Sequence, residues 1–217
     1  MIKNKKVFFI VIILIVSLIL FFLIQFVYKK IISGNNIIKS DYDLIEYILN
    51  ISSYEAKLEV TVHSNKSTNK YLLEQYYMEP NYSKQIVREP KNLENLEIIF
   101  NGNNLEIKNT NLGLSKIYQN YDYLNDNLLW LNFFIENCKE DYKVEQSNEE
   151  EIILYSNFKG YKLKLYISKK TSLPSKIEVL DNNNQSKIYI EYKEIKLNNI
   201  QENNIFAYLI KDIKKEV

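Results

Sequence analysis

The chain has 217 residues, of which 46% are hydrophobic, and it carries 28 basic and 27 acidic side chains. That length predicts one domain or at most two small ones. A single cysteine, Cys138, and a single histidine, His63, exclude a disulfide framework and a zinc site built from cysteine and histidine. Four scattered glycines exclude a P-loop and a dinucleotide-binding fingerprint, so no cofactor is predicted.

The N-terminal segment predicts a membrane anchor. Val7 to Val27 form a run of 21 residues without charge, 19 of them apolar, and a helix of this length crosses the roughly 30 Å hydrocarbon core of a bilayer. Neither a small-residue cleavage site nor a lipoprotein cysteine follows, which indicates an uncleaved, single-pass signal anchor. Three lysines and the terminal amine precede the run and two lysines follow it, so residues 1–6 are expected in the cytoplasm.

The rest of the chain is expected to form one domain on the extracytoplasmic side of that membrane. Residues 28–40 are predicted to be a polar linker, residues 41–210 the folded domain and residues 211–217 a frayed tail. Beyond Lys30 the chain has 23 basic and 27 acidic residues. A mildly acidic domain with a single arginine argues against a surface for DNA or RNA.

Two segments predict helices. Ser40, with Asp43 three residues later, resembles a capping box, and the apolar residues that follow at helical spacing predict a helix that ends near Asn50. Residues 126–138 are apolar nearly all round but too short to span a membrane. This second segment therefore predicts a helix that is buried on several sides.

Most of the domain alternates apolar and polar residues with a period of two, which predicts strands. Ala56, Leu58, Val60 and Val62 show the pattern clearly. Strands are predicted over 56–63, 70–78, 82–88, 96–100, 105–108, 114–118, 151–155, 161–168, 175–181 and 186–195, with a strand or a helical turn over 205–210. The Asn-Gly pair at 101–102 predicts a tight hairpin.

About ten strands joined by hairpins predict a mainly β (α+β) fold with one antiparallel sheet. A sheet of this size is expected to curl into a half-barrel that wraps the apolar mid-chain helix. This layout resembles the LolA-like, lipoprotein-carrier fold family, and the match covers most of residues 41–210. The segments that carry the resemblance are EAKLEVTVHSNKSTNKYLLEQYYMEP (55–80), YSKQIVREP (82–90), IIFNGNNLEI (98–107) and LPSKIEVLDNNNQSKIYIEY (173–192).

Within that fold family, the chain is most similar to the GerS-related germination proteins of clostridia. The similarity lies in residues 82–85, 88–90, 102–107, 114–118 and 129–131. It implies a non-enzymatic protein at the outer face of a spore-former's membrane, with a cell-wall amidase as a possible partner. GerS itself is a lipoprotein, whereas this chain lacks the lipobox cysteine, so its attachment to the membrane is expected to differ.

No candidate catalytic or metal site stands out. His63 falls on the polar side of its predicted strand, and nothing in the sequence places an activating base beside Cys138, so a dyad of the two has little support. Ser67 and Lys70 match the S-x-x-K pattern but lie in a turn composition without the companion motifs of that chemistry. We therefore predict a binding protein and no enzyme.

The apolar segment around Leu129, Trp130, Phe133 and Phe134 has two interpretations. These side chains either line a groove for an acyl chain or a partner's helix, or they fill the concave side of the sheet as core, and the core interpretation is favoured. The favoured function is a protein that docks a cell-wall or cortex-processing partner in spore formation or germination. The alternative is a lipid or lipoprotein acyl-chain carrier or sensor, against which a permanent anchor argues.

Overall fold

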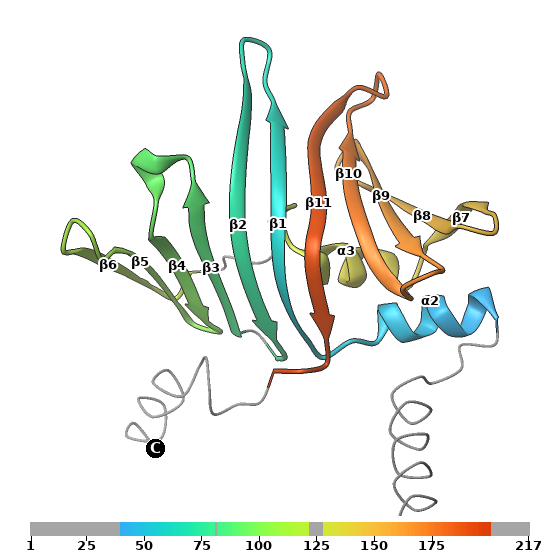
Figure 1. Ribbon diagram of the computed structural model, residues 1–217, viewed down its shortest axis with the longest axis horizontal. Coiled ribbons are helices and arrows are strands. Elements are labelled where there is room, and N and C mark those ends of the chain that lie inside the picture. The colour runs from blue at the N-terminus through green and yellow to red at the C-terminus, as the bar shows by residue number, and fades with distance from the viewer. Residues whose placement is uncertain (1–39, 81, 122–127, 201–217) are drawn as a thin grey trace, which may run out of the picture. The chain divides into compact units, whose positions relative to one another are not determined.

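The computed structural model describes residues 40–80, 82–121 and 128–200 (Figure 1). The predicted anchor from Val7 to Val27 and the predicted element over 205–210 lie outside these ranges. The elements described below belong to one compact unit that begins at Asp41. Within the three ranges, no helix combines the length and the apolar composition needed to cross a membrane.

The described part of the chain contains two α-helices, a short 3-10 helix and eleven strands. The helices are α2 (Asp41–Leu49), η1 (Lys91–Leu93) and α3 (Leu131–Cys138). The strands are β1 (Ser53–His63), β2 (Thr68–Met78), β3 (Tyr82–Glu89), β4 (Leu96–Asn101), β5 (Asn104–Asn109), β6 (Leu114–Gln119), β7 (Lys143–Ser147), β8 (Glu151–Phe158), β9 (Tyr161–Ser168), β10 (Leu173–Leu180) and β11 (Ser186–Leu197).

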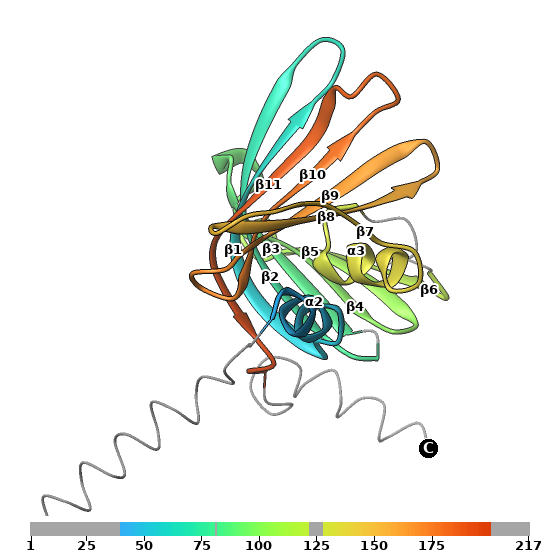
Figure 2. The same ribbon diagram turned by 90° about the vertical axis from the view of Figure 1, so that its right-hand side faces the viewer.

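All eleven strands form one antiparallel sheet in the order β6-β5-β4-β3-β2-β1-β11-β10-β9-β8-β7. Each half of the sheet is a meander of strands that follow one another in the chain, and the pairing of β1 with β11 joins the halves. β6 and β7 lie at opposite ends of the strand order, so the sheet is not closed into a barrel. Figure 2 shows the sheet curving around α2 and α3, as the sequence predicts for a mainly β fold.

The two faces of the sheet have different compositions. On β1, the side chains of Tyr54, Leu58 and Val60 are almost fully buried, whereas Lys57 on the opposite face is exposed. This alternation is the period of two found in the sequence, because successive side chains of a strand point to opposite faces. The buried face lies on the concave side of the sheet, where it contacts α3.

α3 is shorter than the sequence predicts. The helix begins at Leu131, and the residue before it, Trp130, is extended with φ −106° and ψ 136°. Two bonds to the sheet hold the chain in this shape, since the Gln75 amide donates to the Leu129 carbonyl at 3.2 Å and the Leu131 N–H donates to the Tyr54 hydroxyl at 3.3 Å. Leu131 is the first residue of α3, so its N–H has no acceptor within the helix, and the Tyr54 hydroxyl supplies one.

Three buried polar side chains, linked to one another by hydrogen bonds, determine where the start of α3 contacts the sheet. The Tyr54 hydroxyl donates to Gln75 Oε1 at 3.2 Å, and Gln75 Nε2 donates to Gln85 Oε1 at 2.9 Å. Tyr54 and Gln75 are completely buried, and a buried polar group without a partner costs about 1–3 kcal/mol. Because these three side chains satisfy one another, they hold the start of α3 at one position on the sheet.

The sequence prediction missed β7. Its five residues, Lys143 to Ser147, include one aliphatic side chain, and all five are exposed. An edge strand with so little buried surface has no apolar alternation, which is the signal that identified the other strands.

Replacing Trp130 by alanine is expected to lower the free energy of unfolding by about 3–5 kcal/mol, because the fully buried ring leaves a cavity against Tyr54. Chemical denaturation of the full chain followed by circular dichroism measures the change. Tyr42→Ala on α2 is the matched control, since that ring is 64% exposed and its removal should change the free energy by less than about 0.5 kcal/mol. Equal effects of the two substitutions would contradict the burial of Trp130.

Candidate functional site

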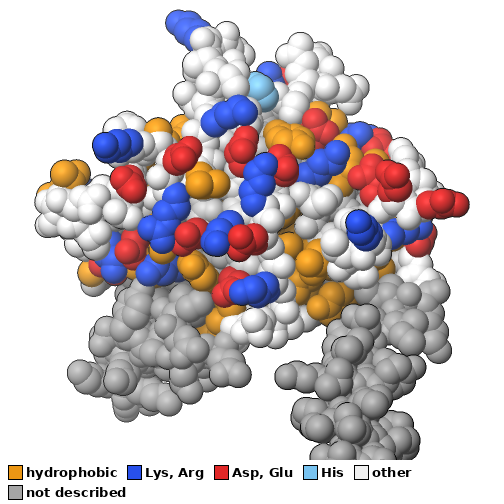
Figure 3. All heavy atoms as spheres, viewed as in Figure 1, with side chains coloured by type: hydrophobic (Ala, Val, Ile, Leu, Met, Phe, Trp, Pro, Cys, Tyr) orange, Lys and Arg blue, Asp and Glu red, His pale blue; other side chains and the backbone are white. Residues whose placement is uncertain are grey.

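The convex face of the sheet carries many charges, but they neutralise one another. Figure 3 shows basic and acidic side chains interleaved over this face. The ion pairs include Lys57–Glu194 and Lys84–Glu97, both at 3.0 Å, and Arg88–Glu74 at 2.7 Å. A face of alternating paired charges presents no large field of one sign, so it is a poor surface for attracting a charged partner.

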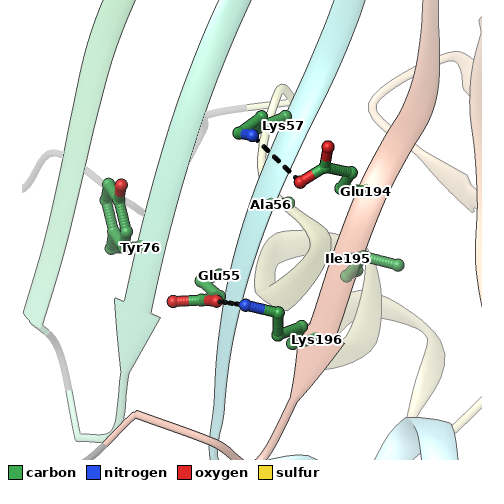
Figure 4. Close-up of a pocket in the computed structure, with 7 residues that line it drawn as sticks. All are labelled: Glu55, Ala56, Lys57, Tyr76, Glu194, Ile195 and Lys196. Atoms are coloured by element: carbon green, nitrogen blue, oxygen red, sulfur yellow. Dashed lines mark hydrogen bonds and ion pairs between the residues drawn. The ribbon is translucent and has the colours of Figure 1, made fainter.

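A hollow of about 130 Å³ opens on this face beside the register shift between Lys57 and Leu58 (Figure 4). Tyr76 and Ile195 supply its larger uncharged side chains. Its four charged lining residues form two ion pairs, Lys57 with Glu194 and Lys196 with Glu55. The hollow therefore offers no unpaired charge to a ligand, and its volume is small for a small-molecule site.

The ion pair between Arg88 and Glu74 on this face is partly buried. Arg88 Nη2 donates to Glu74 Oε2 at 2.7 Å, and Arg88 Nη1 donates to Asn95 Oδ1 at 3.0 Å. The hydrogen bond from Arg88 holds the pKa of Glu74 below its ordinary value of 4.5 and outweighs the opposing effect of burial. This pair joins β2 to β3 and gives the stability of the sheet a dependence on acid.

The structure separates the titratable residues that the sequence singled out. His63 Nδ1 lies 3.0 Å from Thr68 Oγ1 across the β1–β2 hairpin, while Cys138 ends α3 in the interior. Burial raises the pKa of the Cys138 thiol to about 12, which makes it a poor nucleophile. Ser67 lies in the hairpin turn, as its composition predicts, with Lys70 following on β2.

Metal binding has no support in the part of the chain that the structure describes. No three His, Cys, Asp or Glu side chains there come together in a group that could hold a metal ion.

The predicted concave-face residues lie in the interior. Trp130, Phe133 and Phe134 are at most 2% exposed, and Leu129 is half-buried. The Trp130 ring lies 6.4 Å from the ring of Tyr54 on β1, and Phe133 packs edge-on against Phe158 of β8 at 5.0 Å. Their contacts are with other protein side chains, and a role in lining a ligand groove stays a prediction.

One end of the described sheet is the edge strand β6. All six residues of this strand are exposed, and its only paired neighbour among the described strands is β5. Leu114 is 63% exposed and Ile117 is 60% exposed. Leu112, Tyr118 and Tyr121 beside them are 66%, 37% and 47% exposed. We call these five residues the β6 edge patch.

The opposite edge, at β7, is protected in the ways that sheet edges usually are. β7 has a register shift between Val144 and Gln146, and Glu145 on this strand forms ion pairs with Lys162 and Lys164, both at 2.6 Å. Bulges and charged side chains discourage the addition of another strand. Val144, 49% exposed, is its one large apolar side chain, so the two edges offer different surfaces.

The sequence predicts the strand at 114–118 but not its exposure. Alternating apolar residues indicate a strand with one buried face, and β6 has no buried residue. A strand's place in the sheet depends on pairing between distant residues, which a local pattern does not contain.

The family of the chain follows from its sequence match. The family described as sporulation protein YdcC-like matches residues 5–206. The chain belongs to this YdcC-like family. No curated protein sequence matches it significantly. The resemblance to LolA-like and GerS-related proteins that the sequence predicts is confirmed.

Several solved structures are similar to this YdcC-like protein. An uncharacterised conserved protein from Thermus thermophilus is 13% identical, with a TM-score of 0.50 over 76% of this chain and 91% of that one. A chain from the complex of the CwlD amidase with the GerS lipoprotein of Clostridioides difficile is 28% identical, with a TM-score of 0.45 over 70% and 91%. The LolA superfamily protein NE2245 from Nitrosomonas europaea is 14% identical, with a TM-score of 0.40 over 75% and 95%.

Cys138 of the YdcC-like protein is expected to resist thiol reagents while the protein is folded, because its thiol is fully buried and its pKa is about 12. Alkylation by iodoacetamide at neutral pH, followed by mass spectrometry, should label only a trace of the native full chain. The same chain in concentrated guanidinium chloride should label completely. Rapid labelling of the native protein would contradict the burial.

Lowering the pH is expected to weaken the sheet through Glu74. The pKa of Glu74 is lowered in the folded state, so the ionised carboxylate stabilises the fold. This contribution to the free energy of unfolding is at its full value above the ordinary pKa of 4.5, and it is lost as the pH falls through the lowered pKa. Between about pH 7 and about pH 3, the Tm should fall more for the wild type than for Glu74→Gln. Glu149→Gln, in an exposed turn, should follow the wild type, and a Glu74→Gln curve parallel to the wild type would contradict the prediction.

Proposed function

We propose that this YdcC-like chain is a non-enzymatic binding protein that docks a cell-wall or cortex-processing protein during spore formation or germination. Its predicted anchor from Val7 to Val27 would hold the domain at the extracytoplasmic face of the membrane. The partner class comes from the sequence resemblance to GerS-related proteins, and an amidase is the first candidate. Membership of a sporulation family supports the setting.

The β6 edge patch is the observation that carries this proposal. Single exposed apolar side chains are ordinary on protein surfaces, but a run of them along an unpaired strand edge is typical of an interaction site. An extended segment of a partner adds to such an edge through backbone hydrogen bonds, and pockets for alternate side chains supply specificity. Leu114 and Tyr118 would contact the partner on one face of β6, and Ile117 on the other.

The acyl-chain carrier is less well supported. A carrier needs open apolar space on the concave side, and the large side chains that would line it, Trp130, Phe133 and Phe134, are at most 2% exposed. An enzyme is also less well supported, because the thiol of Cys138 is buried with a raised pKa, while His63 lies at a hairpin with Thr68.

Introducing a charge into the patch is expected to abolish docking without unfolding the domain. Ile117→Lys should reduce co-purification of the cortex amidase of the same organism with the full chain from detergent-solubilised membranes by more than tenfold, because apolar contacts at an interface centre are worth about 2 kcal/mol or more. Quantitative immunoblotting of the tagged pair measures the ratio.

Val144→Lys on β7 is the matched control, since it puts the same charge on the other edge at a similarly exposed apolar position. It should leave co-purification unchanged. Circular dichroism should give the same Tm for both variants within a few degrees. If Ile117→Lys retains the amidase as well as Val144→Lys does, the β6 edge patch is not the docking surface; if the wild type retains none, the amidase is not the partner.

A further inference from the structure

A second hollow, of about 290 Å³, lies between two turns at one end of the sheet. One turn joins β8 to β9 around Gly160, and the other joins β10 to β11 from Asp181 onward. The opposite end of β9 leads to Lys169, which pairs with Asp41 of α2 at 2.7 Å. The hollow therefore lies at the end of the sheet away from α2.

Both turns are held in place. Gly160 has φ +84°, a conformation that favours glycine, and Phe158 just before it packs edge-on against Phe133 of α3. In the second turn, Asp181 Oδ1 accepts hydrogen bonds from the N–H groups of Asn183 at 2.8 Å and Gln185 at 2.9 Å. A pocket built on two fixed turns needs little rearrangement to bind a ligand.

The charged residues of the hollow are already paired. Asp181 Oδ2 lies 3.0 Å from Lys187 Nζ, and Lys162 Nζ lies 2.6 Å from Glu145 Oε1. The pKa of Asp181 is lowered, first by the backbone N–H of Gln185 and then by Lys187. Asp181 therefore stays ionised and engaged near neutral pH, and the hollow does not select a charged ligand.

The remaining polar groups are uncharged amides. Asn157, Asn182 and Asn184 line the hollow, and within the described ranges none of their side chains has a hydrogen bond to another residue. Each amide can donate two hydrogen bonds and accept two. Tyr161 completes this lining with a ring that is 38% exposed, so an aromatic surface stands beside several neutral donors and acceptors.

From this geometry we propose that the hollow between the β8–β9 and β10–β11 turns binds a neutral saccharide unit, with the Tyr161 ring against the sugar face. Sugar hydroxyl groups both donate and accept hydrogen bonds, which matches the amides of Asn157, Asn182 and Asn184. The apolar C–H face of a sugar matches an exposed aromatic ring, which combines an apolar surface with a polar hydroxyl. This site is separate from the β6 edge patch and does not depend on the partner proposed for it.

Isothermal titration of the full chain in detergent micelles tests the proposal, with the tetramer of N-acetylglucosamine as the probe. The wild type should show saturable binding, and Tyr161→Ala should weaken it by on the order of tenfold, which is the effect of about 1.4 kcal/mol. Asn182→Ala should weaken it severalfold. Maltotetraose, which lacks the acetamido groups, shows whether any neutral sugar is bound or only the N-acetylated kind; binding of either supports the proposal.

Two variants serve as controls. Tyr42→Ala removes an exposed tyrosine from α2, and Ile117→Lys alters the β6 edge patch; both should bind the probe like the wild type. Co-sedimentation of the full chain with insoluble peptidoglycan then distinguishes a wall-bound glycan from a free oligosaccharide as the source of the sugar. Absence of saturable binding of both probes to a correctly folded wild type, or unchanged binding in Tyr161→Ala, would overturn the proposal.

Discussion

Glu55 and Lys196 lie side by side on β1 and β11 although they are 141 residues apart in the sequence. These two strands pair from Tyr54–Leu197 to Val62–Ile188, and their pairing is the only ladder that joins the two meanders of the described sheet. Without it, the chain would form two smaller sheets, each with an extra open edge. The continuous concave face that contacts α3 depends on this long-range pairing.

Once the two meanders are joined, the two faces of the sheet have different roles. The concave face packs against Trp130 and Phe133, and the hydrogen-bonded side chains of Tyr54, Gln75 and Gln85 determine where α3 starts. The convex face places its charges in opposed pairs, each worth little when exposed. The large side chains of α3 and of the residue before it, Trp130, Phe133 and Phe134, are at most 2% exposed, and we therefore propose that binding takes place at the rim of the sheet.

The rim offers two different surfaces. At one edge, β6 presents exposed aliphatic and aromatic side chains, and β5 is its one paired neighbour among the described strands, which suits the addition of a protein segment. At the end of the sheet away from α2, the turns around Gly160 and Asp181 form a polar hollow, which suits a small neutral ligand. The two proposed binding surfaces of this YdcC-like protein therefore lie on different strands of the sheet, β6 for one and the turns of β8 to β11 for the other.

Local patterns in the chain predict the strand boundaries to within a few residues, the first helix and the Asn-Gly hairpin, and its single cysteine excludes a disulfide framework. These features depend on local periodicity and residue chemistry, which a single sequence contains. Three features are visible only in the folded domain: α3 begins at Leu131, β7 is a strand, and β6 is an edge with Leu114 and Ile117 exposed. These features depend on which strands pair although they are distant in the sequence, and a local sequence pattern does not contain that information.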